Sequence, residues 1–335
     1  MNQVFLPKEY TEKLDLYQTQ LAIGMLRQYF QEKLCKNLNL KRVTAPLFVS
    51  SETGLNDDLN GIERPVDFEV KATGTNVQVV HSLAKWKRLA LYEYKFSVGD
   101  GLYTDMNAIR RDEDLDNLHS VYVDQWDWEK VITRQDRTRD YLEKTVQDIV
   151  DAICDTAEMI KREFPAVDID LGRKVKFITT QELEDLYPDL TPKQRENAIT
   201  KEYGTVFLMC IGDTLKSGIR HDGRAPDYDD WTLNGDILFW NDVMDSAFEV
   251  SSMGIRVDEK AMEEQLKKAN CEYRKEMPFH KMLLNGELPL TIGGGIGQSR
   301  LCMLILQKAH IGQVQVSVWD EETKKICSQN GITLL

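Results

Sequence analysis

The stretch "IGGGIGQSRLCMLIL", residues 292–306, places four glycines and one arginine in front of an apolar run. Glycine has no side chain, so these positions let the backbone turn sharply or let another group approach it closely. Ser299 is the candidate N-cap of a helix, and the apolar residues 301–306 predict that this helix is buried. Arg300 then stands at the entrance of an apolar helix, where a charge is costly unless it has a partner.

Two interpretations of Arg300 stay open on these residues alone. The arginine either forms an interior ion pair or binds an anion such as a phosphate, because a helix start favours negative charge. The glycines match neither the P-loop pattern nor a clean dinucleotide-binding fingerprint with a ribose-binding acid downstream. The rest of the chain has to decide between the two.

Composition excludes several classes of function. The chain has 335 residues, a net charge of −13, and 42% hydrophobic and 29% charged residues. The negative charge argues against a nucleic-acid partner, since phosphate neutralisation needs clustered Lys and Arg. No apolar run approaches the ~18 residues of a membrane helix, and the N-terminus lacks a signal core. We therefore expect a cytoplasmic protein with no membrane contact and six scattered, reduced cysteines.

Hydrophobic periodicity predicts helices and long strands that follow one another along the chain. Helices are expected over residues 8–36, 82–94, 137–164, 192–203 and 258–276. "HSVYVDQWDWEKVI" alternates like the return strand of a long-looped hairpin, with Val123, Gln125 and Asp127 on one face. Strands adjacent in sequence predict an α+β fold, an antiparallel sheet flanked by helices, and no linker interrupts a single domain spanning 1–335.

Ionisable residues lie within strands that are otherwise apolar. Gln125 and Asp127 share one face, Asp236 opens "DILFWN", and Glu249 and Arg256 belong to "FEVSSMGIR". One strand carboxylate usually faces solvent, but several on converging strands favour a charged pocket for a zwitterion and a metal–phosphate. Mg²⁺ uses one or two protein carboxylates, and Asp236 and Glu249 are the candidates.

The dense polar stretch "RHDGRAPDYDDW", residues 220–231, has two interpretations. It is either an ordinary polar surface loop or a flap. As a flap, it would supply Arg224 for phosphate and carboxylates such as Asp229 for an incoming cation.

Several of these blocks resemble the signatures of class II aminoacyl-tRNA synthetases. "GIGQSRLCMLIL" resembles their third signature, "IRRDED" with the following strand resembles the second, and "LKRVTAPLF" with Pro46 resembles the dimer-forming first. From "VVHSLAKWKR" to "TIGGGIGQSRL", the whole chain is more similar to ammonia-dependent asparagine synthetases of the A type. The resemblance implies a class II synthetase-like catalytic core, a homodimer, and no appended tRNA-binding domain.

The resemblance also implies roles for individual residues. Arg110 would contact the ATP α-phosphate and Arg300 the outer phosphates, although the neighbouring Arg111 also fits the second signature. The residues implied for ATP are Arg110, Arg224, Gly294 and Arg300, and those implied for Mg²⁺ are Asp236 and Glu249. The residues implied for aspartate are Asp57, Lys87, Gln125, Asp127, Ser251, Ser252 and Arg256.

The implied reaction converts L-aspartate, ammonia and ATP into asparagine through β-aspartyl-AMP, releasing AMP and pyrophosphate. Arg110, Arg300 and Asp229 are the implied catalytic residues. Either Asp229 or Asp57 would accept the proton that ammonium must lose, and the sequence does not choose between them. Two rival functions are a tRNA-charging synthetase and a non-catalytic paralogue, which would tend to lose the phosphate arginines or the metal-binding acids.

Overall fold

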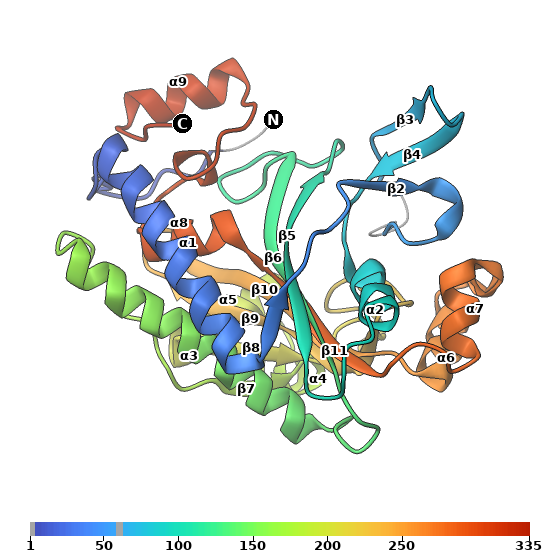
Figure 1. Ribbon diagram of the computed structural model, residues 1–335. Helices are drawn as coiled ribbons and strands as arrows, with labels where there is room; N and C mark the ends of the chain where they lie inside the picture. Colours follow the sequence, from blue (N-terminus) through green and yellow to red (C-terminus); the bar gives the residue numbers. More distant parts are fainter. Residues whose placement is uncertain (1–3, 58–62) are drawn as a thin grey trace.

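A large β-sheet forms the centre of the protein (Figure 1). The computed structural model describes residues 4–57 and 63–335. The sheet has eight strands, in the order β1-β5-β6-β11-β10-β9-β8-β7, and a separate three-stranded sheet has the order β2-β4-β3. The strands are β1 Leu40–Arg42, β2 Phe48–Ser50, β3 Asp67–Val70, β4 Thr75–Val79, β5 Gly101–Ile109, β6 Tyr122–Val131, β7 Lys176–Thr179, β8 Thr205–Met209, β9 Asp229–Asn241, β10 Ser246–Arg256 and β11 Thr291–Gly297.

The predicted antiparallel sheet is in fact mixed. Its six central strands pair antiparallel, but β1 pairs parallel with β5 and β7 pairs parallel with β8. Parallel neighbours need a crossover connection, and here helices lie between the paired strands in sequence. The α+β class holds, and the correction concerns the two edges of the sheet. The predicted hairpin of "HSVYVDQWDWEKVI" is confirmed, since β6 pairs antiparallel with β5.

The described residues also form helices. They are α1 Leu16–Leu38, α2 Ala84–Glu93, α3 Arg139–Glu163, α4 Thr180–Leu186, α5 Pro192–Tyr203, α6 Glu259–Lys268, α7 Pro278–Leu284, α8 Gln298–Ile305 and α9 Glu321–Gln329. Helix α5 begins with the predicted capping box of Thr191 and Gln194 and ends at Gly204. Helix α1 begins at Leu16 rather than residue 8, because Asp15 forms a capping box with Gln18.

Two expectations about helix ends are wrong. Ser299 is not the N-cap of α8: Gly297 holds that position, and no side-chain cap bond comes from it. The helix predicted over 258–276 ends at Lys268, where Asn270 adopts a left-handed conformation with φ of 56°. The amide of Cys271 then donates to the carbonyl of Leu266 at 3.0 Å, a closure that stops the helix.

The two faces of the sheet have different coverings. The main core joins α1, α3 and α8 to inward residues such as Trp126 and Trp128 of β6. Side chains alternate along a strand, so Gln125, Asp127 and Glu129 point to the opposite face. Helices α2, α6 and α7 lie to one side of the sheet (Figure 1).

All six cysteines are free thiols. No helix among the described residues is both long enough and apolar enough to span a membrane.

Candidate active site

A cavity of about 790 Å³ lies over the polar face of the central strands. This volume lies within the usual range for small-molecule sites. Thirteen of the fourteen residues that the sequence singled out line it; Asp236 lies behind the lining. The thirteen are Asp57, Lys87, Arg110, Gln125, Asp127, Arg224, Asp229, Glu249, Ser251, Ser252, Arg256, Gly294 and Arg300.

The glycines of residues 293–297 form strand β11, not a turn. Gly293, Gly295 and Gly297 pair with Glu129, Asp127 and Gln125 of β6. A Cβ on Gly293 would collide with the Glu129 carboxylate, and one on Gly295 would collide with the Gln125 amide. The close approach predicted for these glycines is therefore confirmed: they leave room for the polar side chains of the neighbouring strand.

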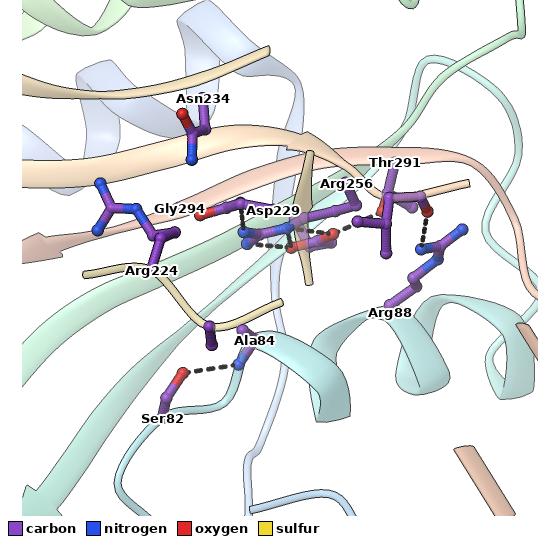
Figure 2. Close-up of polar contacts among 12 residues, drawn as sticks. Ser82, Ala84, Arg88, Arg224, Asp229, Asn234, Arg256, Thr291 and Gly294 are labelled. Atoms are coloured by element: carbon purple, nitrogen blue, oxygen red, sulfur yellow. Dashed lines mark hydrogen bonds and ion pairs between the residues drawn. The ribbon is translucent and has the colours of Figure 1, made fainter. Parts of the chain in front are cut away.

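A buried cluster of charges lies at one end of the cavity. Arg256 donates to both carboxylate oxygens of Glu129, at 2.8–3.1 Å, and also to Asp229. Figure 2 shows Arg256 beside Asp229, with Thr291 and Gly294 of β11 close by. Glu129 is fully buried and also accepts from the Thr291 hydroxyl at 2.6 Å. Arg256 is thus held rigidly from two sides, with its guanidinium at the cavity.

Lys87 and Asp127 form the second ion pair of this cluster. The ammonium of Lys87 donates to Asp127 and to the carbonyls of Trp128 and Gly294, at 2.9 and 3.1 Å. Burial lowers the pKa of Lys87 and raises the pKa of Asp127, since neither charge is hydrated. Asp127 Oδ2 is buried with no hydrogen-bond partner among the residues described. An amino-acid zwitterion suits such a pair, because its carboxylate and ammonium can satisfy Lys87 and Asp127 respectively.

Arg300 lies at the other end, next to the start of α8. Its guanidinium donates to His119 Nε2 and to the Glu249 carbonyl, both at 3.0 Å, and lies 3.6 Å from the Glu249 carboxylate. Its side chain is 24% exposed, so the pairing with Glu249 is not an interior one. Gly293 of β11 lies beside Arg256, and Gly297 lies beside Arg300. These glycines are four residues apart, so at ~3.3 Å per residue the two ends of the site are about 13 Å apart.

His119 has a defined tautomer. Arginine can only donate, so His119 Nε2 is the acceptor, and Nδ1 carries the hydrogen that is donated to Asp116 at 2.9 Å. The Asp116–His119 pair therefore helps to orient Arg300 together with Glu249.

Arg110 and Arg111 differ clearly in position. Arg110 follows β5, lines the cavity, and has a buried Nε without a hydrogen-bond partner among the described residues. Arg111 is exposed and does not line the cavity. An anion bound in the cavity would therefore meet Arg110.

Arg224 lies in the segment before β9 and contacts Asp236. Its Nη2 lies 2.5 Å from Asp236 Oδ1. Burial, opposed by Arg224 and reinforced by repulsion from Glu249, raises the pKa of Asp236 to about 7. The two carboxylates lie on adjacent strands β9 and β10 and repel one another, which fits a pair that shares a divalent cation. No group of three or more His, Cys, Asp or Glu suited to a metal occurs in the described part of the chain, and Mg²⁺ takes its other ligands from phosphate and water.

Three functional residues escaped the sequence analysis. Glu129 continues the same alternation as Gln125 and Asp127, and that period-two signal was enough to find it. His119 carries no local signal, because its partner Arg300 is 181 positions away. Asp124 replaces the missing cap of α8: its carboxylate accepts from the Ser299 amide at 3.0 Å and hydroxyl at 2.8 Å.

Comparison with known proteins identifies the family. The family description "Aspartate-ammonia ligase" matches residues 17–331. An aspartate–ammonia ligase of Clostridium tetani is 61% identical over 334 residues, covering 99% of this chain and 98% of the relative. One of Clostridium perfringens is 59% identical over 336 residues, covering 100% of both chains. The chain belongs to the aspartate–ammonia ligase family. This ligase makes asparagine from aspartate and ammonia with ATP.

The fold of the ligase resembles that of solved asparaginyl-tRNA synthetases. Asparaginyl-tRNA synthetase of Entamoeba histolytica, in complex with asparaginyl-adenylate, superposes with a TM-score of 0.63 at 12% identity, over 90% of this chain and 66% of that one. The asparaginyl-adenylate complex of the Pyrococcus horikoshii enzyme gives a TM-score of 0.62 at 15% identity, over 90% and 68%. At this identity, the likeness concerns the fold alone.

Proposed function

We propose that the ligase activates aspartate as β-aspartyl-AMP with release of pyrophosphate, and that ammonia then displaces AMP. The observation that carries this proposal is a cavity lined both by the buried charges of Lys87, Asp127 and Arg256 and by Arg110 and Arg300. A carboxylate does not react with ammonia directly, because its leaving group would be oxide, and adenylation supplies a better one. Such a transfer needs positioning and charge neutralisation more than covalent help from the protein.

Aspartate enters with its α-carboxylate towards Lys87 and Arg256 and its amino group towards Asp127 and Gln125. Asp57 is proposed near the amino group, and Ser251 and Ser252 line the site beside it. This orientation leaves the β-carboxylate directed towards Arg110 and the ATP α-phosphate. The Lys87–Asp127 ion pair supports this orientation. When aspartate binds, its carboxylate can pair with Lys87 and its ammonium with Asp127, so neither buried charge is left unpaired.

ATP is bound through arginines that present planar forks to phosphate oxygens. Arg110 is proposed at the α-phosphate, Arg300 at the outer phosphates, and Arg224 as the residue that closes over them, while Asp229 stays paired with Arg256. Gly294 is proposed at the ATP site through its main chain, since a Cβ there would meet Met253 of β10 and its carbonyl contacts Lys87 at 3.1 Å. Preorganised donors of this kind stabilise charge that develops in the transition state.

Asp236 and Glu249 would hold Mg²⁺, as their mutual repulsion suits a divalent cation. The ion would supply charge neutralisation to the phosphates when bound. Arg224, which contacts Asp236, would then be released to the nucleotide.

The deciding experiment measures products. The protein incubated with ATP, aspartate and ammonium should form asparagine, AMP and pyrophosphate in equal amounts. With aspartate but no ammonium, it should exchange labelled pyrophosphate into ATP. If ADP and phosphate formed instead, the intermediate would be β-aspartyl phosphate and not the adenylate.

We also propose a homodimer of single-domain chains, 1–335. Apolar side chains are exposed along α1 and after Pro46, among them Tyr17 at 73%, Leu21 at 47% and Leu47 at 52%. Burying such a surface stabilises association. Light scattering coupled to size exclusion should give twice the mass of one chain, and Leu21→Lys should shift it towards one chain's mass.

A further inference from the structure

His81 lies in the wall of the cavity, and the proposed mechanism gives it no task. It follows β4, directly precedes Ser82 at the start of the α2 segment in Figure 2, and is only 1% exposed. Its ring Nδ1 lies 3.0 Å from the carbonyl oxygen of Asp57, and its backbone amide donates to Asn56 Oδ1 at 2.8 Å. Both contacts fix the ring in place.

The contact with Asp57 determines the tautomer. A carbonyl oxygen can only accept, so Nδ1 of His81 carries the hydrogen and Nε2 presents a lone pair. This Nε2 is shielded from bulk water and has no hydrogen-bond partner among the residues that the structure describes. The ring therefore offers a fixed, unused proton acceptor in the cavity wall.

The position of His81 relates it to the proposed α-phosphate ligand. Its neighbours Val80 and Leu83 pack against Ala108 and Val123 of the β5–β6 hairpin. Ala108 precedes Arg110 by two residues, so His81 lies beside the hairpin that carries the proposed α-phosphate ligand.

We propose that His81 Nε2 accepts the proton that ammonium loses before it attacks, which makes this part of the cavity the ammonia subsite. The inference rests on the proposed adenylate mechanism. The N–H bond of ammonium breaks and its proton moves to Nε2. The freed nitrogen lone pair forms the C–N bond to the β-carbonyl carbon. The C–O bond to AMP then breaks, its electron pair leaves with AMP, and one further proton from nitrogen passes to water.

This assignment differs from the two carboxylates that the sequence offered for the same task. Asp229 is engaged by Arg256, so its charge is already used to position that arginine. The main-chain carbonyl of Asp57 contacts His81, and its carboxylate is kept for the amino group of aspartate in the proposed mechanism. The imidazole is the base, and residue 57 sets its tautomer.

The test uses His81→Asn in the full chain. Asparagine can keep the N–H donated to the Asp57 carbonyl but has no basic nitrogen. Ammonium-dependent asparagine formation should fall by roughly 10²- to 10⁴-fold, the usual contribution of a general base. Aspartate-dependent pyrophosphate–ATP exchange by the same variant should stay within a few-fold of the parent, which also reports that the variant folds.

Hydroxylamine provides the second arm, because it is largely unprotonated at neutral pH and needs no base. Hydroxylamine-dependent formation of aspartyl hydroxamate should therefore survive in the variant. Normal use of ammonium by His81→Asn overturns the proposal, and so does an equal loss of exchange, which would indicate a role in aspartate binding or folding. His81→Gln presents an acceptor without basicity, and full activity in that variant also overturns it. Failure of the parent to exchange pyrophosphate would instead refute the adenylate mechanism.

Discussion

Replacing Arg300 by alanine separates the two interpretations that the sequence left open. The side chain is 24% exposed, and its carboxylate partner Glu249 is 40% exposed at a distance of 3.6 Å. Ion pairs with this exposure contribute about 0–1 kcal/mol to stability. Arg300→Ala should therefore leave the free energy of unfolding nearly unchanged.

The catalytic effect of the same change should be much larger. If Arg300 neutralises the departing pyrophosphate, its loss should reduce the adenylation rate by roughly 10²- to 10³-fold, the effect of removing one preorganised donor. Pyrophosphate–ATP exchange measures this step directly. Aspartate affinity should change little, because Lys87 and Arg256 make that contact, and attack of ammonia on preformed adenylate should be spared.

Arg195 of α5 offers a matched control. It forms a truly interior ion pair with Glu184 at 3.2 Å, with both side chains under 10% exposed, and it does not line the cavity. Arg195→Ala should lower the free energy of unfolding, since Glu184 loses its cationic partner and the Tyr187 and Pro188 carbonyls lose their donor, while folded protein exchanges normally. If Arg300→Ala behaved like Arg195→Ala in both assays, the phosphate role would be wrong.

Three further outcomes are expected. Glu129→Gln should raise the KM for aspartate in the exchange assay at least tenfold, because it loosens the arginine that Glu129 holds with charge-assisted bonds worth about 1.5–3 kcal/mol each; an unchanged KM contradicts this. Gly295→Ala should also weaken aspartate binding, since its Cβ would displace the Gln125 amide. Gly24→Ala in α1 is the control, because a Cβ there meets nothing within 4 Å. The control variant should keep full activity and gain up to about 1 kcal/mol of stability. Burial lowers the pKa of His310 to about 4, so on acidification the unfolded chain takes up the proton before the folded chain does. The free energy of unfolding should therefore fall by up to about 3 kcal/mol as the pH drops from 6.5 towards 4. His310→Asn should flatten this part of the pH–stability profile, and an identical profile would refute the assignment.

The polar face of the site was predictable because its residues recur at every second position of one strand. Gln125 and Asp127 alternate with Trp126 and Trp128, and the strand pleat sends the two sets to opposite faces. The glycines of β11 were correctly expected to allow a close approach. The capping box at Thr191 was equally readable, since a helix start depends on side chains within one turn.

Only the tertiary structure decided which groups meet. Arg256 and Glu129 are 127 positions apart, and Arg300 and His119 are 181 apart. The cap of α8 comes from Asp124 on a neighbouring strand, which is why the nearby Ser299 was the wrong choice. The parallel edges of the sheet likewise follow from how the crossovers run. Sequence periodicity reports the face on which a residue lies, because that depends on adjacent backbone angles. Partners across the fold depend on how strands and helices pack, and no local pattern records that.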